Sequence, residues 1–228
     1  LISNLEDLIW FRYQVNEGND YEGKYIKVTA TEIDLNNEEW TPIAMGKTFK
    51  GNFDGNNVTV KNLKITKALT NSAENNGIGF FGRTDDPATI ENIIIENVDI
   101  TGSLYVGAIV GYGYTGKHVK GCTVKGNIAI DAWWYAGVIG GNGYMNLVDD
   151  CHVIGNEDSY IKGNYGSYIG GIWGFRGEGN NKITNCTVEN LDIIGVDRVG
   201  GICGIGHYGN TISGCDAEDV TVTATDPE

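Results

Sequence analysis

The sequence predicts an all-β protein, a single-stranded right-handed parallel β-helix (solenoid) with an N-terminal capping helix. The 228 residues include 34 Gly and only 3 Pro, and such a chain, also rich in Asn, Thr, Ile and Val, favours short strands joined by tight turns. Two motifs recur in phase about every 30 residues. Within them apolar and polar residues alternate, as in strands with one buried face.

The first motif is a glycine-rich hexapeptide. It occurs five times, at residues 77–82 (GIGFFG), 106–111 (VGAIVG), 136–141 (AGVIGG), 169–174 (IGGIWG) and 199–204 (VGGICG). Its closing glycines lie 29 to 33 residues apart. Glycine at a fixed phase is expected where strands turn a corner, because a corner needs positive φ or room for a closely approaching backbone.

The second motif follows each hexapeptide at a constant phase. It occurs at residues 90–95 (IENIII), 119–124 (VKGCTV), 148–153 (VDDCHV), 183–188 (ITNCTV) and 212–217 (ISGCDA). In 119–124, Cys122 and Val124 are apolar and flank the polar Thr123, which is the alternation of a half-buried strand. Further alternating stretches often follow, so each repeat offers about three short strands and no helix.

Strands this short cannot bury their apolar faces alone, so each coil must lie on the next, with like residues stacked about 4.8 Å apart. A propeller blade needs about 40 residues in four antiparallel strands, and leucine-rich repeats need their own Leu/Asn ladder. Neither pattern is present. A right-handed coil is expected because parallel β crossovers follow that rule.

The first 45 residues lack the repeats and are expected to form an N-terminal cap of a helix and strands. Ser3 to Glu6 has the form of a capping box, and Leu5, Leu8 and Ile9 form an apolar face of a helix over residues 4–15. A strand over residues 25–33 would complete the cap. Residues 46–228 would form the coils of one domain, and we expect the native protein to continue beyond residue 228.

The repeats resemble the GLUG-motif family, named for a repeated Gly-Leu-hydrophobic-Gly core. The matching stretches are 79–82 (GFFG), 108–111 (AIVG), 171–174 (GIWG) and 201–204 (GICG), and Ile or Phe replaces Leu throughout. The block before them, with 33–35 (IDL), 40–43 (WTPI), 49–55 (FKGNFDG) and 60–63 (VKNL), is similar to segments that precede such repeats in surface proteins of gut bacteria. The resemblance implies a secreted or cell-surface protein, since such repeats occur in adhesin-like proteins and beside proteases that cleave immunoglobulin A.

The net charge and the hydropathy of the sequence reduce the classes of partner that are expected. The formal net charge of −14 would repel a phosphate backbone, so nucleic acid is not an expected partner. No apolar run approaches the ~20 residues of a membrane-spanning helix, so membrane insertion is not expected either. We expect a monomer at the bacterial outer surface or outside the cell, whose partner is a glycan or a host or surface protein.

Aromatic residues at repeated positions are the candidate binding site. Tyr105, Tyr135 and Tyr168 each precede a hexapeptide and should form an outward ladder, continued by Arg198. Two further features complete the candidate set: Trp133 and Trp134 next to Tyr135, and Tyr114 in phase with Tyr144. Such side chains either hold sugar rings or a protein ligand, or only stack across coils and stabilise the sheet.

Four of the five cysteines share one phase: Cys122, Cys151, Cys186 and Cys215. Zinc motifs need CxxC-like pairs or nearby His, which are absent. Stacked coils would place the Cβ atoms about 4.8 Å apart, wider than the ~3.8 Å of a disulfide. A buried column of reduced thiols is the expected arrangement.

Catalysis and metal binding have weaker signals. Asp149, Asp150 and His207 distantly resemble the site of β-helical pectin hydrolases, but adjacent carboxylates on a strand face opposite sides. Asp54, or the Asp85–Asp86 pair, could supply carboxylate ligands for calcium. Asp before Gly is also common in turns, which is the alternative interpretation of Asp54. No other cofactor is expected.

The sequence therefore predicts a binding or adhesion module that is not an enzyme. A carbohydrate-active enzyme, a polysaccharide lyase or glycoside hydrolase, is the alternative, and a structural stalk is the third hypothesis.

Overall fold

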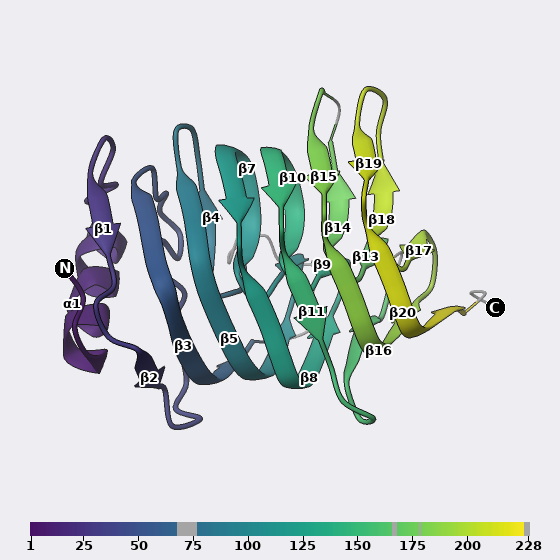
Figure 1. Ribbon diagram of the computed structural model, residues 1–228, viewed down its shortest axis with the longest axis horizontal. Coiled ribbons are helices and arrows are strands. Elements are labelled where there is room, and N and C mark those ends of the chain that lie inside the picture. The colour runs from purple at the N-terminus through teal and green to yellow at the C-terminus, as the bar shows by residue number, and fades with distance from the viewer. Residues whose placement is uncertain (68–76, 166–167, 178, 226–228) are drawn as a thin grey trace.

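The computed structural model describes residues 1–67, 77–165, 168–177 and 179–225. They form a right-handed parallel β-helix of about six turns, with one helix covering its N-terminal end (Figure 1). The predicted fold class is confirmed. Within the described residues, no helix follows the first one.

The elements run in this order: α1 (Leu5–Asn16), β1 (Tyr25–Lys27), β2 (Glu32–Asp34), β3 (Asn52–Thr66), β4 (Phe81–Thr84), β5 (Thr89–Gly102), β6 (Tyr105–Val106), β7 (Val110–Lys120), β8 (Thr123–Ala132), β9 (Tyr135–Gly137), β10 (Gly140–Asp149), β11 (His152–Ile154), β12 (Tyr160–Gly163), β13 (Tyr168–Gly170), β14 (Trp173–Arg176), β15 (Lys182–Thr184), β16 (Thr187–Gly195), β17 (Val199–Gly200), β18 (Cys203–Gly206), β19 (Thr211–Ser213) and β20 (Asp216–Ala224). Strands β6, β9, β13 and β17 form a separate four-stranded sheet.

Equivalent residues of successive coils lie in register and fill a continuous core, except that the members in β20, Ala217 and Val222, are exposed. One column joins β2, β3, β5, β8, β11, β16 and β20: Ile33, Val60, Ile95, Val124, Val153, Val188 and Ala217. A second joins Ile65, Ile100, Ile130, Ile161, Ile193 and Val222. Since each coil supplies the interior of its neighbour, burial depends on stacking and not on any one repeat.

The corner before the second strand of each coil is fixed by a left-handed backbone. Its column consists of Asn57, Asn92, Gly121, Asp150, Asn185 and Gly214, all with φ between 54° and 63°. Only Gly, Asn and Asp adopt this conformation readily. Asn also bonds to the preceding coil: the side-chain nitrogens of Asn92 and Asn185 donate to Asp54 and Asp149 at 3.0 and 2.9 Å.

The glycine hexapeptide forms a different corner, where two layers of backbone touch. A Cβ on Gly111 would lie 2.1 Å from the backbone nitrogen of Ile78, and one on Gly141 would lie 2.4 Å from that of Val106. Gly140 leaves room for the Trp173 ring of the next coil, which a Cβ would meet at 2.2 Å. The repeated glycines therefore serve close packing here, because neither Gly111 nor Gly141 has positive φ.

The N-terminal helix covers the first coil, but its cap and buried face differ from the prediction. Asn4 is the N-cap, accepting from the Asp7 backbone N–H at 2.9 Å, while the Ser3 hydroxyl donates to the Asp7 carboxylate. The capping box is thus displaced by one residue. The buried face is Leu8, Phe11 and Val15, whereas Ile9 is 40% exposed, because the first coil meets the helix along the 8/11/15 line.

The predicted strand over residues 25–33 is two short strands. β1 and β2 pair in parallel with separate parts of β3. The chain bends between them because β3 also spans a corner of the coil. Residues of the cap therefore form the first rung of the solenoid as well as its end.

The four cysteines form the predicted column, but Cys215 is only partly buried, in contrast to the other three. Thr123, His152, Thr187 and Asp216, each following one of these cysteines, pair in register, and Cys122, Cys151 and Cys186 are fully buried. All five cysteines are free thiols. Burial raises the pKa of Cys151, so this thiol stays protonated and behaves as a small apolar core residue.

Candidate binding face

The predicted tyrosine ladder is present on the four-stranded sheet. Tyr105, Tyr135 and Tyr168 pair in register, with ring centroids 5.4 and 4.8 Å apart. The Arg198 guanidinium continues the ladder, lying 4.8 Å from the Tyr168 ring. The structure therefore agrees with the predicted alignment of these four residues in one ladder.

A second row lies beside the ladder and was not predicted. It consists of Arg83, Tyr112, Asn142, Phe175 and Ile205, which pair in register on β4, β7, β10, β14 and β18. Each follows the closing glycine of a hexapeptide, so the signal was available at a fixed phase. The two rows meet: Tyr105 stacks on Tyr112 at 4.6 Å, and Phe175 packs edge-on against Tyr135 and Tyr168.

The ladder presents edges and hydroxyl groups to solvent, because its ring faces cover one another. Tyr135 and Tyr168 are inclined by only 21°, so neither ring offers a free face toward its partner. Burial, followed by the proximity of Tyr105, raises the pKa of Tyr112 to about 12. That hydroxyl remains protonated at neutral pH and is available as a hydrogen-bond donor.

The tryptophan pair lies at one edge of the ladder, in the β8–β9 connection. Trp134 stacks on Tyr135 at 5.8 Å, and Trp133 stacks on Tyr165 at 5.2 Å. Both side chains are half-buried, and both indole N–H groups are buried without a hydrogen-bond partner in the described part of the chain. The two tryptophans therefore widen the aromatic surface without projecting far from it.

Tyr114 and Tyr144 are not in phase, contrary to the prediction. Tyr144 pairs with Thr115, because the register of β10 on β7 shifts between Gly143 and Tyr144. A bulge of this kind re-aims a side chain without ending the pairing. Both rings remain exposed, by 43% for Tyr114 and 39% for Tyr144.

The shifted Tyr144 lines an open depression of about 450 Å³. The other walls come from Asp86 after β4, from Thr115 and Gly116 of β7, and from Asn180 and Asn181 in the β14–β15 connection. That connection and the adjacent β18–β19 connection project beyond the earlier coils at the top of Figure 1. Of the residues that line the depression, Tyr144 was predicted as a binding residue and Asp86 as a candidate calcium ligand, and the others were not predicted.

The acidic residues considered for glycoside hydrolysis are not brought together with His207. Asp149 accepts hydrogen bonds from Thr184 and Asn185 and forms an ion pair with Lys120 at 3.1 Å. The Thr184 bond, with smaller contributions from Lys120 and Asn185, lowers the Asp149 pKa. His207 instead packs against the Phe175 ring at 5.1 Å.

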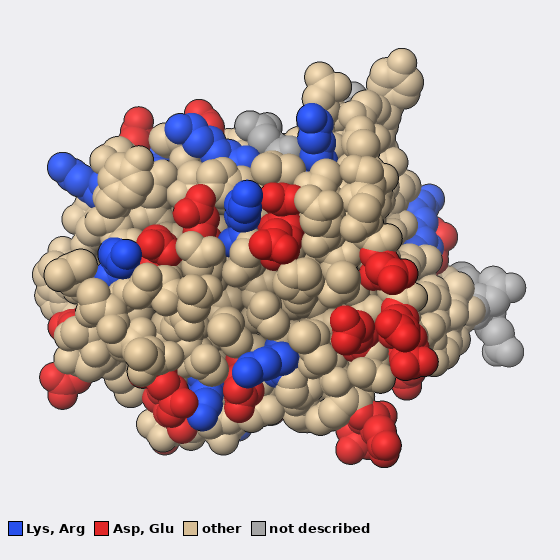
Figure 2. All heavy atoms as spheres, viewed as in Figure 1, with Lys and Arg blue, Asp and Glu red and all other residues tan. Residues whose placement is uncertain are grey.

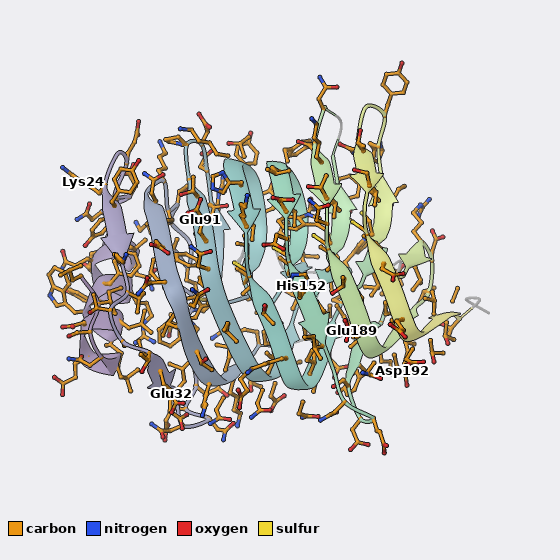
Figure 3. The ribbon with its side chains drawn as sticks, in the orientation of Figure 1. Lys24, Glu32, Glu91, His152, Glu189 and Asp192 are labelled. Carbon is orange, nitrogen blue, oxygen red and sulfur yellow. The ribbon has the colours of Figure 1, made fainter. Side chains whose placement is uncertain are left out.

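A separate polar group lies on the outer face of β11, where Figure 3 labels His152 between Glu91 and Glu189. His152 Nδ1 is 2.9 Å from the Thr187 hydroxyl, and its Nε2 is 3.3 Å from an Asp150 carboxylate oxygen. This places a carboxylate, an imidazole and a hydroxyl in one hydrogen-bonded series, the order of groups used in nucleophilic catalysis.

The candidate calcium residues have other bonds. The Asp54 carboxylate accepts from the Asn56 backbone and from Asn92, and Asp85 accepts from the Thr115 hydroxyl. Among the described residues, no three His, Cys, Asp or Glu side chains form a metal-binding group. Likewise, the described part of the chain has no helix with the length and apolar character needed to span a membrane.

Charges of both signs cover the face seen in Figure 2, with acidic side chains gathered toward the C-terminal end. Figure 3, in the same orientation, labels Glu189 and Asp192 of β16 there, and Glu189 pairs directly with Glu218 of β20 across the two coils. The aromatic ladder belongs to the other sheet, so the acidic surface and the aromatic surface are separate features.

Comparison with known proteins supports the fold. No family model matches this chain. A crystal structure of "a putative immunoglobulin A1 protease from Bacteroides ovatus" superposes with a TM-score of 0.59 and 17% sequence identity, over 100% of this chain and 79% of that one. Halomucin from Haloquadratum walsbyi is 35% identical over 63 residues, which are 28% of this chain and 1% of Halomucin.

The prediction that the chain is not an enzyme is contradicted by the structural similarity to the Bacteroides ovatus protein. That prediction depended on the weak catalytic signal of Asp149, Asp150 and His207, yet the same fold occurs in a protein named as a protease. At 17% identity the similarity shows a shared fold alone, so it assigns no activity to this chain. Parallel coils are compatible with binding and with catalysis, and function must be argued from the surface.

Proposed function

We propose that this chain is a ligand-binding module of an extracellular surface protein of the GLUG-repeat type, and that its aromatic face binds a glycan. The observation that carries the proposal is the tyrosine ladder across successive coils, which Tyr112 and Phe175 of the second row join at the hexapeptide corner. Its regular spacing suits a ligand that is itself a repeating polymer. The local similarity to Halomucin supports the extracellular location.

The chemistry of this face favours sugars over an apolar ligand. The stacked tyrosines contribute hydroxyl edges, while Tyr114 and Tyr144 expose parts of their rings. Sugars need both features, because their hydroxyl groups form hydrogen bonds and their C–H faces pack on aromatic rings. A protein ligand would be expected to bury a wide apolar centre, which a row of hydroxyl edges does not provide.

A glycan array is the direct test. The wild-type chain should bind a subset of oligosaccharides, and Trp133→Ala, Trp134→Ala and Tyr135→Phe should each weaken binding while thermal unfolding stays cooperative. Trp10→Ala provides a matched control, because Trp10 is an exposed aromatic (60%) on α1, away from the ladder. Absence of binding to any glycan, together with capture of a purified protein ligand, would contradict the proposal.

Peptide-bond hydrolysis is the second candidate function. The fold neighbour's name supports it, and the series Asp150–His152–Thr187 supplies a carboxylate, an imidazole and a hydroxyl at hydrogen-bond distances. In this role, Thr187 would be the nucleophile, His152 the base and Asp150 the group that orients the base.

Immunoglobulin A1 is the substrate to test first, with cleavage followed by gel electrophoresis and mass spectrometry. His152→Ala and Thr187→Val should both abolish any cleavage, whereas His118→Ala, which removes a histidine paired with Glu91 on another coil, should not. Cleavage that persists in Thr187→Val would exclude this nucleophile. Intact antibody after prolonged incubation with the wild-type chain would rule out this candidate.

A further inference from the structure

We propose that the depression beside Tyr144 is a subsite for one neutral, hydroxyl-rich sugar ring. The inference depends on the proposed glycan binding and adds to it a location and a ligand class. The volume of about 450 Å³ and the open shape suit a terminal or branching sugar, because a ring can enter from solvent without any strand moving.

Tyr144 supplies a rigid aromatic wall. Its ring lies directly over Gly177, where an added Cβ would meet the ring at 1.9 Å. The backbone at Gly177 therefore holds one side of the ring, while 39% of the residue remains exposed toward the depression. An aromatic ring fixed before binding loses little conformational entropy when a sugar packs on it.

Asn181 supplies a fixed hydrogen-bond acceptor. Its side chain is 4% exposed, and its amide nitrogen donates to the Gly177 carbonyl at 3.2 Å and to the Asn210 side chain at 3.0 Å. These bonds use both amide hydrogens. The amide oxygen bonds no donor within the described residues, so it is available to accept from a ligand hydroxyl group.

Asp86 and Asn180 supply polar groups on the rim. Both side chains are exposed. In the part of the chain that the structure describes, the Asp86 carboxylate and the Asn180 side-chain amide have no hydrogen-bond partner. Thr115, in contrast, already donates to Asp85 and accepts from the Asp86 backbone at 3.0 Å. The depression thus offers uncommitted acceptors on three residues, Asp86, Asn180 and Asn181, beside one aromatic wall.

This combination favours a neutral sugar over a charged one. The charged side chain among the described lining residues is Asp86, and a carboxylate accepts strong hydrogen bonds from hydroxyl groups. The same carboxylate repels the acid groups of sialylated, sulfated or uronate sugars, and the net charge of −14 adds to that repulsion. An amine ligand would also pair with Asp86. It would form fewer hydrogen bonds with the Asn181 oxygen and the Asn180 amide than a sugar ring with several hydroxyl groups.

The experiment compares neutral, sialylated, sulfated and uronate oligosaccharides on an array, followed by calorimetry with the best neutral oligosaccharide. Asp86→Asn and Tyr144→Ala should each weaken binding about tenfold or more, and Asn180→Ala should weaken it less. Tyr208→Ala is the control, because Tyr208 is 93% exposed on the neighbouring β18–β19 connection and does not line the depression. Circular dichroism during heating checks that each variant is folded.

The outcomes separate this inference from the proposal on which it depends. Preference for acidic sugars, or binding of neutral sugars that Asp86→Asn and Tyr144→Ala leave unchanged, overturns the subsite while glycan binding stands. Lysine-rich peptide binding that requires Asp86, without any sugar binding, identifies an amine site instead and overturns both. Neutral-sugar binding lost in both folded variants supports the subsite.

Discussion

Two of the corners in each coil turn the chain by different physical means. At the asparagine corner, the column from Asn57 to Gly214 has positive φ throughout, and side chains are tolerated there. At the hexapeptide corner, Gly111 and Gly141 have no positive φ, yet any Cβ would collide with backbone atoms within 2.4 Å. One corner therefore selects residues by dihedral angle, and the other selects them by space.

This difference has a functional consequence. Because the hexapeptide corner brings two backbone layers into contact, the outward residues on either side of it also meet, as Tyr105 and Tyr112 do at 4.6 Å. The asparagine corner instead links coils through its own polar side chains, as Asn92 does with Asp54. The tight corner thus gathers the aromatic surface, and the polar corner fixes the stacking of coils.

Gly111→Ala should have the largest effect on stability. The new methyl group would meet the Ile78 nitrogen at 2.1 Å and Gly77 backbone atoms at 2.5 Å, and backbone cannot move aside as a side chain can. We expect a loss of about 3 kcal/mol or more in the free energy of unfolding, measured by urea denaturation.

Gly121→Asn is the matched control at the other corner. Gly121 has φ of 61°, and Asn already occupies the same column at Asn92. We expect a change of less than about 1 kcal/mol. Equal losses in the two variants would show that the corners do not differ as argued.

Tyr135→Ala should have the next largest effect, because this ring packs against Tyr105, Tyr168, Phe175 and Trp134. The ring is half-buried, so a loss of about 2 to 3 kcal/mol is expected. Tyr135→Phe keeps the packing and should change the free energy of unfolding by less than about 1 kcal/mol. If Tyr135→Ala is as stable as wild type, the ladder is not a structural element and its alignment serves binding alone.

The ladder and the core could be predicted because both follow the repeat phase. Tyr105, Tyr135 and Tyr168 hold one position in successive coils, and stacking converts a shared phase into contact. The row containing Tyr112 and Phe175 obeyed the same rule but was missed. Its members differ in type, from Arg to Asn to Ile, so residue identity did not reveal the column.

The features that could not be predicted depend on departures from the repeat. One shift of register moves Tyr144 from the partner expected, Tyr114, to Thr115, and no local residue pattern announces it. The depression needs that shift together with residues of three other coils, which lie in β7 and in the connections after β4 and β14. The helix cap was displaced for a similar reason, since Ser3 and Asn4 are both good N-caps and the contact of Leu8, Phe11 and Val15 with the first coil decides between them.

Asn92→Ala tests the asparagine corner directly. Alanine at φ of 56° is strained, and the bond to Asp54 is lost, so the free energy of unfolding should fall by about 1 to 2 kcal/mol. Asn92→Gly also removes the hydrogen bond, but glycine adopts this φ without strain. The free energy of unfolding should therefore fall by less in Asn92→Gly than in Asn92→Ala. Urea denaturation of the two variants separates the contribution of φ from that of the hydrogen bond, and a larger loss in Asn92→Gly would contradict control by dihedral angle.

The smallest expected effect concerns the carboxylate to which Asn185 donates. Hydrogen bonds from Thr184, with Lys120 and Asn185, lower the pKa of Asp149 below the unfolded value of about 3.9. A lowered pKa in the folded state means that its stabilisation is complete above about pH 4 and is lost as the pH falls through the folded pKa. Asp149→Asn should therefore be less stable than wild type near neutral pH, by on the order of 0.5 to 1 kcal/mol, and the difference should shrink below about pH 4. Urea denaturation across this range measures it, and a difference that is independent of pH would mean that Asp149 contributes by shape and not by charge.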